Sequence, residues 1–209
     1  MNQLIIHEKN IIMKIIHYIA FLAIFLMALP VQGQKIKVTQ GDIKDLKGMT
    51  QLKLVYDYSD LGVGKFEKEA DYVAEKVAEM NEEEAGTGDA WKEDWYGDRE
   101  EQYEPKFEEL LNKYAPWLEA GKEVDAPVIL HVHTKFIEPG FNVGVARKPA
   151  YIDLELFFEK DGELLVSMLI LKSPGSGGAG FDYDHGYRIS EAYAKAAKSL
   201  AKYLDKNLN

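Results

Sequence analysis

The feature that most restricts the fold is a pair of apolar runs joined by Asp161-Gly162. Residues 151–158 (YIDLELFF) repeat apolar side chains with the period of two that is typical of a strand. Residues 164–171 (LLVSMLIL) are nearly all apolar, which favours a central strand of a sheet. Because Asp-Gly tolerates the positive φ angles of tight turns, the two runs are predicted to form a β-hairpin.

The same period of two predicts further strands. Residues 51–59 (QLKLVYDYS) alternate strictly, and residues 35–38 carry a shorter strand signal. Residues 127–137 (PVILHVHTKFI) separate an apolar face from a polar one. The apolar face is expected to hold Val128, Leu130, Val132 and Phe136, and the polar face His131, His133 and Lys135.

Three amphipathic helices are predicted from apolar residues spaced three and four apart. Pro105 suits the first turn of the second helix, where a missing N–H costs nothing. The third helix is expected at about 188–204. The inward-facing residues of the three helices are predicted to be, in order, Phe66, Ala70, Val73, Val77 and Met80; Tyr103, Phe107, Leu110 and Tyr114; Ile189, Tyr193, Ala196, Leu200 and Leu204.

Between the first two helices, residues 81–102 carry acids, glycines and two tryptophans without a clear period, which indicates a surface excursion. The elements follow the order β-α-α-β-β-β-α in one domain, residues 34–209. This order predicts an α+β sandwich, with a sheet of about four strands and helices packed on one face.

The N-terminus is predicted to be a signal peptide. One lysine, an apolar run over 15–29 and then Pro30 with small or polar residues form the layout of a secretory signal, with cleavage expected after Gly33. Met13 is the alternative start, because residues 1–12 add nothing that a signal needs. The protein is therefore expected to be exported, either periplasmic or secreted, without a stable membrane anchor after cleavage.

Charge and cysteine content exclude several classes of function. The chain has 25 basic and 35 acidic side chains, and loss of Lys9, Lys14 and Glu8 with residues 1–33 leaves 23 and 34, a net charge of −11. Such an acidic balance argues against nucleic acid as a partner, because nucleic-acid binding needs a basic face. The absence of cysteine excludes disulfides, thiol nucleophiles and cysteine-bound metals.

Three segments together carry a resemblance to a known family: LKLVYDYS leading into a helix, EPGF, and GFDYDHGYRISEAY before the last helix. The chain resembles a family of uncharacterised exported proteins from Bacteroidetes-type bacteria. Its element order is also distantly similar to envelope domains of the TolB N-terminal and curli-secretion-lipoprotein type. That likeness implies a protein that binds other envelope components and is not an enzyme, although this chain lacks the acylated cysteine of the lipoproteins.

The segment 177–188 (GGAGFDYDHGYR) precedes the last helix and raises the question of a ligand site. Its glycine spacing matches neither of the two common phosphate-binding loops, and Asp182 and Asp184 would repel a phosphate. Acids before a helix complement its dipole and cap its free N–H groups. We therefore expect Asp184 to cap the helix and Arg188 to pair with Asp182 or Asp184.

A metal site is the alternative interpretation. His131 and His133 lie two apart on a strand and so project from the same face, near a carboxylate such as Asp153 or Glu155 of a neighbouring strand. Together with Asp182, Asp184 and His185 they supply ligands that zinc or another divalent ion accepts. That arrangement would fit a metal-dependent hydrolase, although no known metal motif is present.

The leading hypothesis is a non-enzymatic envelope protein, without a cofactor, that binds another envelope protein or a glycan. Aromatic and arginine side chains dominate binding surfaces, so the expected contact residues are Trp91, Trp95, Tyr96 and Arg99 in the excursion, with Phe141 in the EPGF loop. The competing interpretation of the tryptophans is a lid folded over the core.

Overall fold

The predicted hairpin forms and organises the sheet. A computed structural model describes residues 36–142, 146–176 and 184–209; the predicted signal segment, residues 1–33, lies outside them. Strands β8 (Tyr151–Lys160) and β9 (Glu163–Pro174) pair antiparallel. Asp161 and Gly162 take φ angles of 53° and 80°, which is the reason that Asp-Gly stands at this turn.

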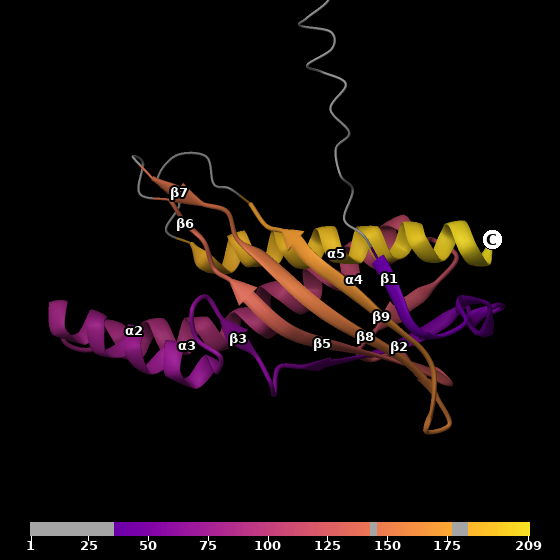
Figure 1. Cartoon of the computed structure of the whole chain (residues 1–209), viewed down its shortest axis with the longest axis horizontal. Helices are drawn as coiled ribbons and strands as arrows, with labels where there is room; N and C mark the ends of the chain where they lie inside the picture. Colours follow the sequence, from indigo (N-terminus) through magenta and orange to yellow (C-terminus); the bar gives the residue numbers. More distant parts are fainter. Residues whose placement is uncertain (1–35, 143–145, 177–183) are drawn as a thin grey trace, which may run out of the picture. The chain divides into compact units, whose positions relative to one another are not determined.

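The sheet has seven strands in the order β1-β9-β8-β5-β2-β4, with β3 paired to β5 (Figure 1). The runs predicted at 51–59, 127–137, 151–158 and 164–171 form its four longest strands, and the shorter signal at 35–38 coincides with the start of β1. The α+β prediction is therefore confirmed. Strands β2 and β5 run parallel, whereas β5, β8, β9 and β1 form an antiparallel series. The remaining bounds are β1 Ile36–Gly41, β2 Gln51–Asp57, β3 Gly62–Val63, β4 Glu119–Gly121 and β5 Val128–Glu138, and a separate ribbon pairs β6 Phe141–Asn142 with β7 Arg147–Lys148.

The strand β5 departs from strict alternation at one point. A bulge between Thr134 and Phe136 shifts the register against β8 by one residue. Ile137 is therefore buried opposite Ile152, and Phe136, which was predicted to face the core, is only half-buried and stacks on Tyr151. The prediction for Phe136 was wrong, because an alternating pattern cannot reveal an inserted residue.

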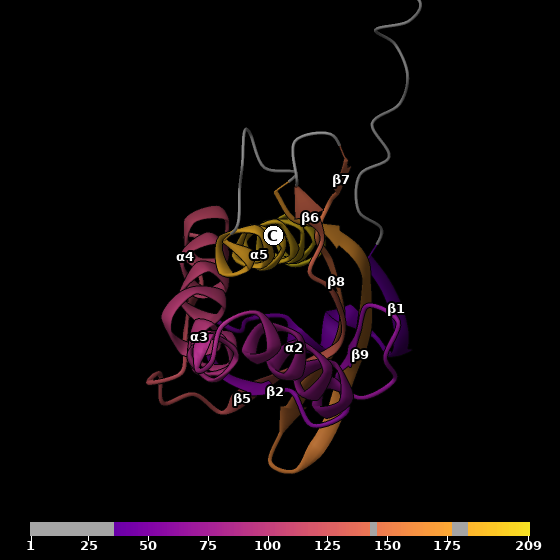
Figure 2. The same cartoon turned by 90° about the vertical axis from the view of Figure 1, so that its left-hand side faces the viewer.

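Helices α4 (Glu104–Tyr114) and α5 (His185–Leu208) cover the core face of the sheet. Figure 2 shows α5 lying within the curve of the sheet, with α4 beside it. All five residues that were predicted to face inward from α5 are fully buried. A short 3₁₀ turn, η1 (Ile43–Leu46), also packs on α5. Within the described ranges, no helix is long and apolar enough to cross a membrane.

The segment 81–102 proves to be largely helical. Helix α2 (Glu69–Glu83) turns at Gly86, where φ is +90°, into α3 (Thr87–Asp98). A π-helical turn, η2 (Arg99–Tyr103), then joins α3 to α4 without a break. The α2–α3 hairpin lies beside β3 at one end of the sheet (Figure 1). Its helices approach closely, because a Cβ on Gly88 would stand 2.3 Å from the carbonyl oxygen of Val77.

Candidate functional site

The candidate site is a cleft of about 620 Å³ between α3, the π-helical turn and the first residues of α5. One aromatic ring, a histidine, five carboxylates and an amide line it, and none of the lysines and arginines that the structure describes does. A cavity of this size falls in the range of small-molecule pockets. Its lining residues are Trp91, Glu93, Asp94, Gly97, Asp98, Glu101, Gln102, Asp184 and His185.

An aromatic stack forms one wall of the cleft. The rings of Trp91 and Trp95 stack at 5.5 Å between centroids, and His185 stacks on Trp95 at 5.3 Å. Tyr72 of α2 packs edge-on against Trp91 at 5.8 Å. Trp91 keeps part of its surface open to the cleft. Trp95 is 1% exposed, so the prediction that it contacts a partner was wrong, and the lid interpretation describes it better.

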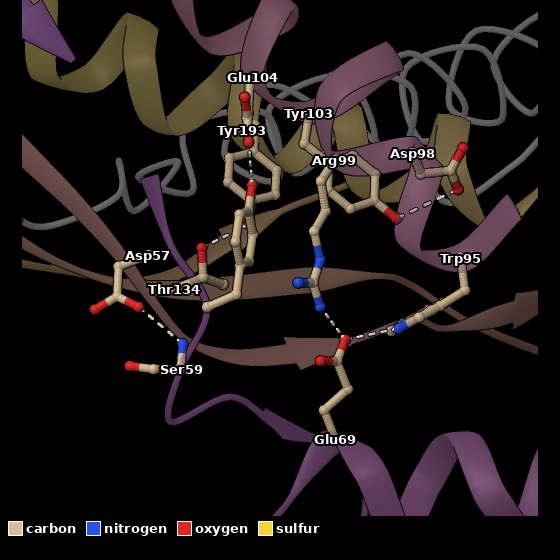
Figure 3. Close-up of polar contacts among 11 residues, drawn as sticks. Asp57, Ser59, Glu69, Trp95, Asp98, Arg99, Tyr103, Glu104, Thr134 and Tyr193 are labelled. Atoms are coloured by element: carbon tan, nitrogen blue, oxygen red, sulfur yellow. Dashed lines mark hydrogen bonds and ion pairs between the residues drawn. The ribbon is translucent and has the colours of Figure 1, made fainter. Parts of the chain in front are cut away.

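Arg99 holds the helices together beneath this stack. Its guanidinium forms an ion pair with Glu69, and Trp95 donates its indole N–H to the same carboxylate at 2.7 Å (Figure 3). The guanidinium also lies over the rings of Tyr58, at 4.3 Å, and Tyr96, at 5.0 Å. Arg99 is therefore an internal pin instead of the predicted contact residue, while Tyr96 remains 37% exposed beside it.

The deepest polar group of the cleft is Asp98, which is 7% exposed. It accepts a hydrogen bond from the Gln102 amide at 2.5 Å, and the Tyr103 hydroxyl lies 3.5 Å away. Burial raises the pKa of Asp98 to about 6, with Asp184 adding to the rise and the Gln102 hydrogen bond opposing it. Asp98 is therefore a carboxylate that is easily protonated near neutral pH.

His185 faces Asp98 from the first turn of α5. Its Nε2 lies 3.2 Å from Oδ2 of Asp98, but the two atoms form no regular hydrogen bond. Burial lowers the pKa of His185, which favours the neutral ring. Gly186, the next residue, has no room for a side chain: a Cβ there would stand 2.3 Å from both Oδ2 of Asp98 and Nε2 of Gln102.

The π-helical turn connects the cleft to the core. Tyr103, its last residue, stacks on Tyr193 of α5 at 5.2 Å and 7°. The Tyr193 hydroxyl shares a hydrogen bond of 2.7 Å with Thr134 of β5 (Figure 3). Tyr103, whose hydroxyl lies 3.5 Å from Asp98, is thus linked through Tyr193 to the sheet. π-helical turns are uncommon and occur often at functional sites.

The helix-cap prediction for Asp184 is confirmed. Its carboxylate accepts the backbone N–H of Tyr187 at 2.9 Å. Arg188 is buried and donates its Nε to the carbonyl oxygen of Pro139 at 3.2 Å. Asp182 lies outside the described residues.

The residues of the predicted metal site are dispersed. His131 and His133 lie on the sheet face turned away from the core, where His131 is 3.4 Å from Glu159. His133 stands 3.7 Å from Asp57 and, as expected from the strand register, 3.9 Å from Glu155. His185 belongs to the cleft instead. In the part of the chain that the structure describes, no three or more such side chains are placed to hold a metal ion.

Phe141 stands apart from the cleft. It lies on β6, paired with Lys148 of β7, and is 45% exposed. Phe141, the predicted contact residue of the EPGF loop, does not line the cleft.

Sequence reasoning missed the acidic residues of the cleft, above all Asp98 and Glu101 with the neighbouring Gln102. The signal that was available was the spacing of three and four among Asp94, Asp98 and Glu101, which places them on one helical face. Because 81–102 was not predicted to be helical, that spacing could not be used.

Comparisons with known proteins leave the family of this chain open. No protein-family model matches it, and no curated protein matches it. A PelC dodecamer from Paraburkholderia phytofirmans has a TM-score of 0.37 at 11% identity, covering 83% of this chain and 96% of that one. A single-residue variant of the same dodecamer has a TM-score of 0.35 at 9% identity, covering 79% and 99%. At TM-scores this low, the likeness assigns neither a fold family nor a function.

Proposed function

We propose that this chain is an exported, non-enzymatic binding protein whose cleft holds a glycan. The observation that carries the proposal is the position of Trp91, whose half-buried ring lines a cleft in which the other side chains are five carboxylates, an amide and His185. Sugars present apolar C–H faces that stack on aromatic rings and hydroxyls that donate to carboxylates. The cleft offers both kinds of contact at once.

The support of Trp91 suits such a role. Its ring packs on Trp95 and Tyr72, so its orientation is set before any ligand arrives. Because the ring is already held in place, it loses little conformational entropy when a ligand binds, and the affinity is higher for that reason. Exposed acceptors for hydroxyl groups stand nearby in Glu93 and Asp94.

Asp98 is better suited to hold the cleft than to react with a ligand. Both of its oxygens have protein neighbours: Oδ1 accepts from the Gln102 amide, and Oδ2 lies 3.5 Å from the Tyr103 hydroxyl and 3.2 Å from Nε2 of His185. A general acid must reach the atom that it protonates, and those contacts occupy the positions from which Asp98 would do so. We therefore assign it a positioning role in a binding cleft.

The test is calorimetric titration of the protein with soluble oligosaccharides built from glucose, N-acetylglucosamine or glucosamine. Binding at about 0.1–1 mM, a free energy near −4 to −5.5 kcal/mol, is expected for one of them. Trp91→Ala should weaken it at least about tenfold. Tyr96→Ala removes an exposed ring of the same helix outside the cleft and should leave the affinity unchanged. Equal weakening by both variants, or no binding of any oligosaccharide, would refute the proposal.

A further inference from the structure

The α2–α3 hairpin carries a second hollow, which shares no residue with the cleft. It is an apolar groove of about 430 Å³ between the two helices. Apart from Lys92 and Tyr96 on the α3 side, its lining is aliphatic: Ala70, Val73, Ala74, Val77 and Ala78 of α2. Three of them, Ala70, Val73 and Val77, belong to the stripe that the sequence predicts to face the core, yet Val73 is the one residue of α2 that is buried. This side of α2 therefore lines a groove that no described element covers.

The spacing of the groove residues fits another helix. Ala70, Ala74 and Ala78 recur every four residues, so they lie one above the other along one face of α2. Val73 and Val77 add the three-four spacing with which helices pack together. Because alanine side chains are small, the backbone of a further helix can approach α2 closely at these positions.

The charges around the groove define the occupant. Helices α2 and α3 together carry ten acidic residues against two lysines, Lys76 and Lys92. Three exposed carboxylates form an edge directly beside the alanines: Asp71 and Glu75 each follow one of them, and Glu82 lies one turn beyond Ala78. Glu75 is paired with Lys65, and Asp71 and Glu82 are exposed to solvent. A complementary partner is cationic along the flank that meets this edge.

We propose that the α2–α3 groove docks a basic amphipathic helix of a partner protein. The apolar face of that helix covers the alanine floor, and its lysines or arginines lie against Asp71 and Glu82. This is the helix-in-groove mode of recognition, in which apolar anchors give affinity and flanking charges give orientation. It goes beyond glycan binding and does not depend on it, because the groove and the cleft share no lining residue.

The probe is a synthetic, fluorescently labelled helix of about three heptads, with leucine and alanine on one face and lysine on the other. A control peptide has glutamate in place of each lysine. The lysine peptide is expected to bind the full chain with a Kd of about 10–100 µM by fluorescence anisotropy, and more weakly as salt rises. The glutamate peptide is expected not to bind, because the acidic edge repels it.

Two matched variants separate the groove from the general charge of the hairpin. Ala74→Gln adds a side chain to the floor and should weaken the lysine peptide at least about tenfold. Glu83→Gln removes a charge from the opposite face of α2 and should change the affinity less than about twofold. Both positions are exposed, and circular dichroism checks that both variants fold.

Four results would overturn the proposal. Three come from the peptides: no binding of the lysine peptide at about millimolar concentration, equal binding by the Ala74→Gln protein, or equal binding of the glutamate peptide. The fourth is a dimer of the protein alone, in sedimentation, that Ala74→Gln abolishes, because a second copy would then fill the groove. The glycan titration uses Trp91 and is independent of each of these outcomes.

Discussion

Gly186 offers the sharpest test of the packing at the cleft. It lies in the first turn of α5, where an exposed glycine changed to alanine normally stabilises a helix by about 0.5–1 kcal/mol. Here the new Cβ would stand 2.3 Å from Oδ2 and 2.5 Å from Oδ1 of Asp98, and 2.3 Å from the Gln102 amide nitrogen. Real Cβ contacts are never so short, so the carboxylate and the amide must both move.

The cost of that movement sets the sign of the effect. Overpacking in a buried site costs about 1–3 kcal/mol, and loss of the hydrogen bond between Gln102 and Asp98 adds about 1 kcal/mol more. The gain of about 0.5–1 kcal/mol from helix propensity opposes these costs. We therefore expect Gly186→Ala to lower the free energy of unfolding by about 1–3 kcal/mol in urea titrations. In a domain of this size that corresponds to a fall in Tm of roughly 2–12 °C.

Gly97→Ala is the matched control, because Gly97 also lies in a helix beside the cleft. Its Cβ would meet only Oε1 of Glu101, at 3.8 Å, which is ordinary contact. We expect this variant to gain about 0.5–1 kcal/mol from helix propensity. If Gly186→Ala proves as stable as Gly97→Ala, then α5 does not begin against Asp98, and the geometry of the cleft is wrong.

Three further predictions concern neighbouring groups. The pKa of Asp98 rises from 3.8 to about 6 on folding, so its contribution to stability is full below about pH 4 and is lost as pH rises through 6. The free energy of unfolding should fall by about 3 kcal/mol over this range, measured by urea titrations. The Asp98→Asn protein should not show this fall. Glu69→Ala leaves Arg99 without its buried partner and should cost about 3 kcal/mol in the same assay. Asp184→Ala removes the cap of α5 and should cost about 1 kcal/mol, measured as a lowered Tm.

The sequence predicts well those elements in which the spacing of apolar residues matches the side that is buried in the structure. The β8–β9 hairpin and α5 are of this kind, because local pattern, turn residue and burial all indicate the same structure. The strands β3 and β4 are two and three residues long, and their pairing depends on neighbours that no local pattern records. Residue by residue, the long strands and α5 were therefore predictable, whereas the width of the sheet was not.

The candidate site was predicted in part, for a related reason. Trp91 and His185 were singled out by residue type and do line the cleft, but they entered different hypotheses, a binding surface and a metal site. Their stacking around Trp95 depends on α3 reaching the start of α5, which is a tertiary contact. Residue type thus identified members of the cleft, and the packing of α3 against α5 determined how they combine.

The π-helical turn explains why the chain from the end of α3 through α4 does not follow a single α-helical period. The buried side of the chain follows a spacing of four: Trp95, Arg99, Tyr103, Phe107 and Leu111. In a regular α-helix each step of four overshoots a full turn by about 40°, so these residues would wind through about 160° and could not all face inward. A π turn holds about one residue more, and therefore removes about 100° of that drift. The irregular turn is what allows one continuous helix to line the cleft at its start and to pack into the core at its end.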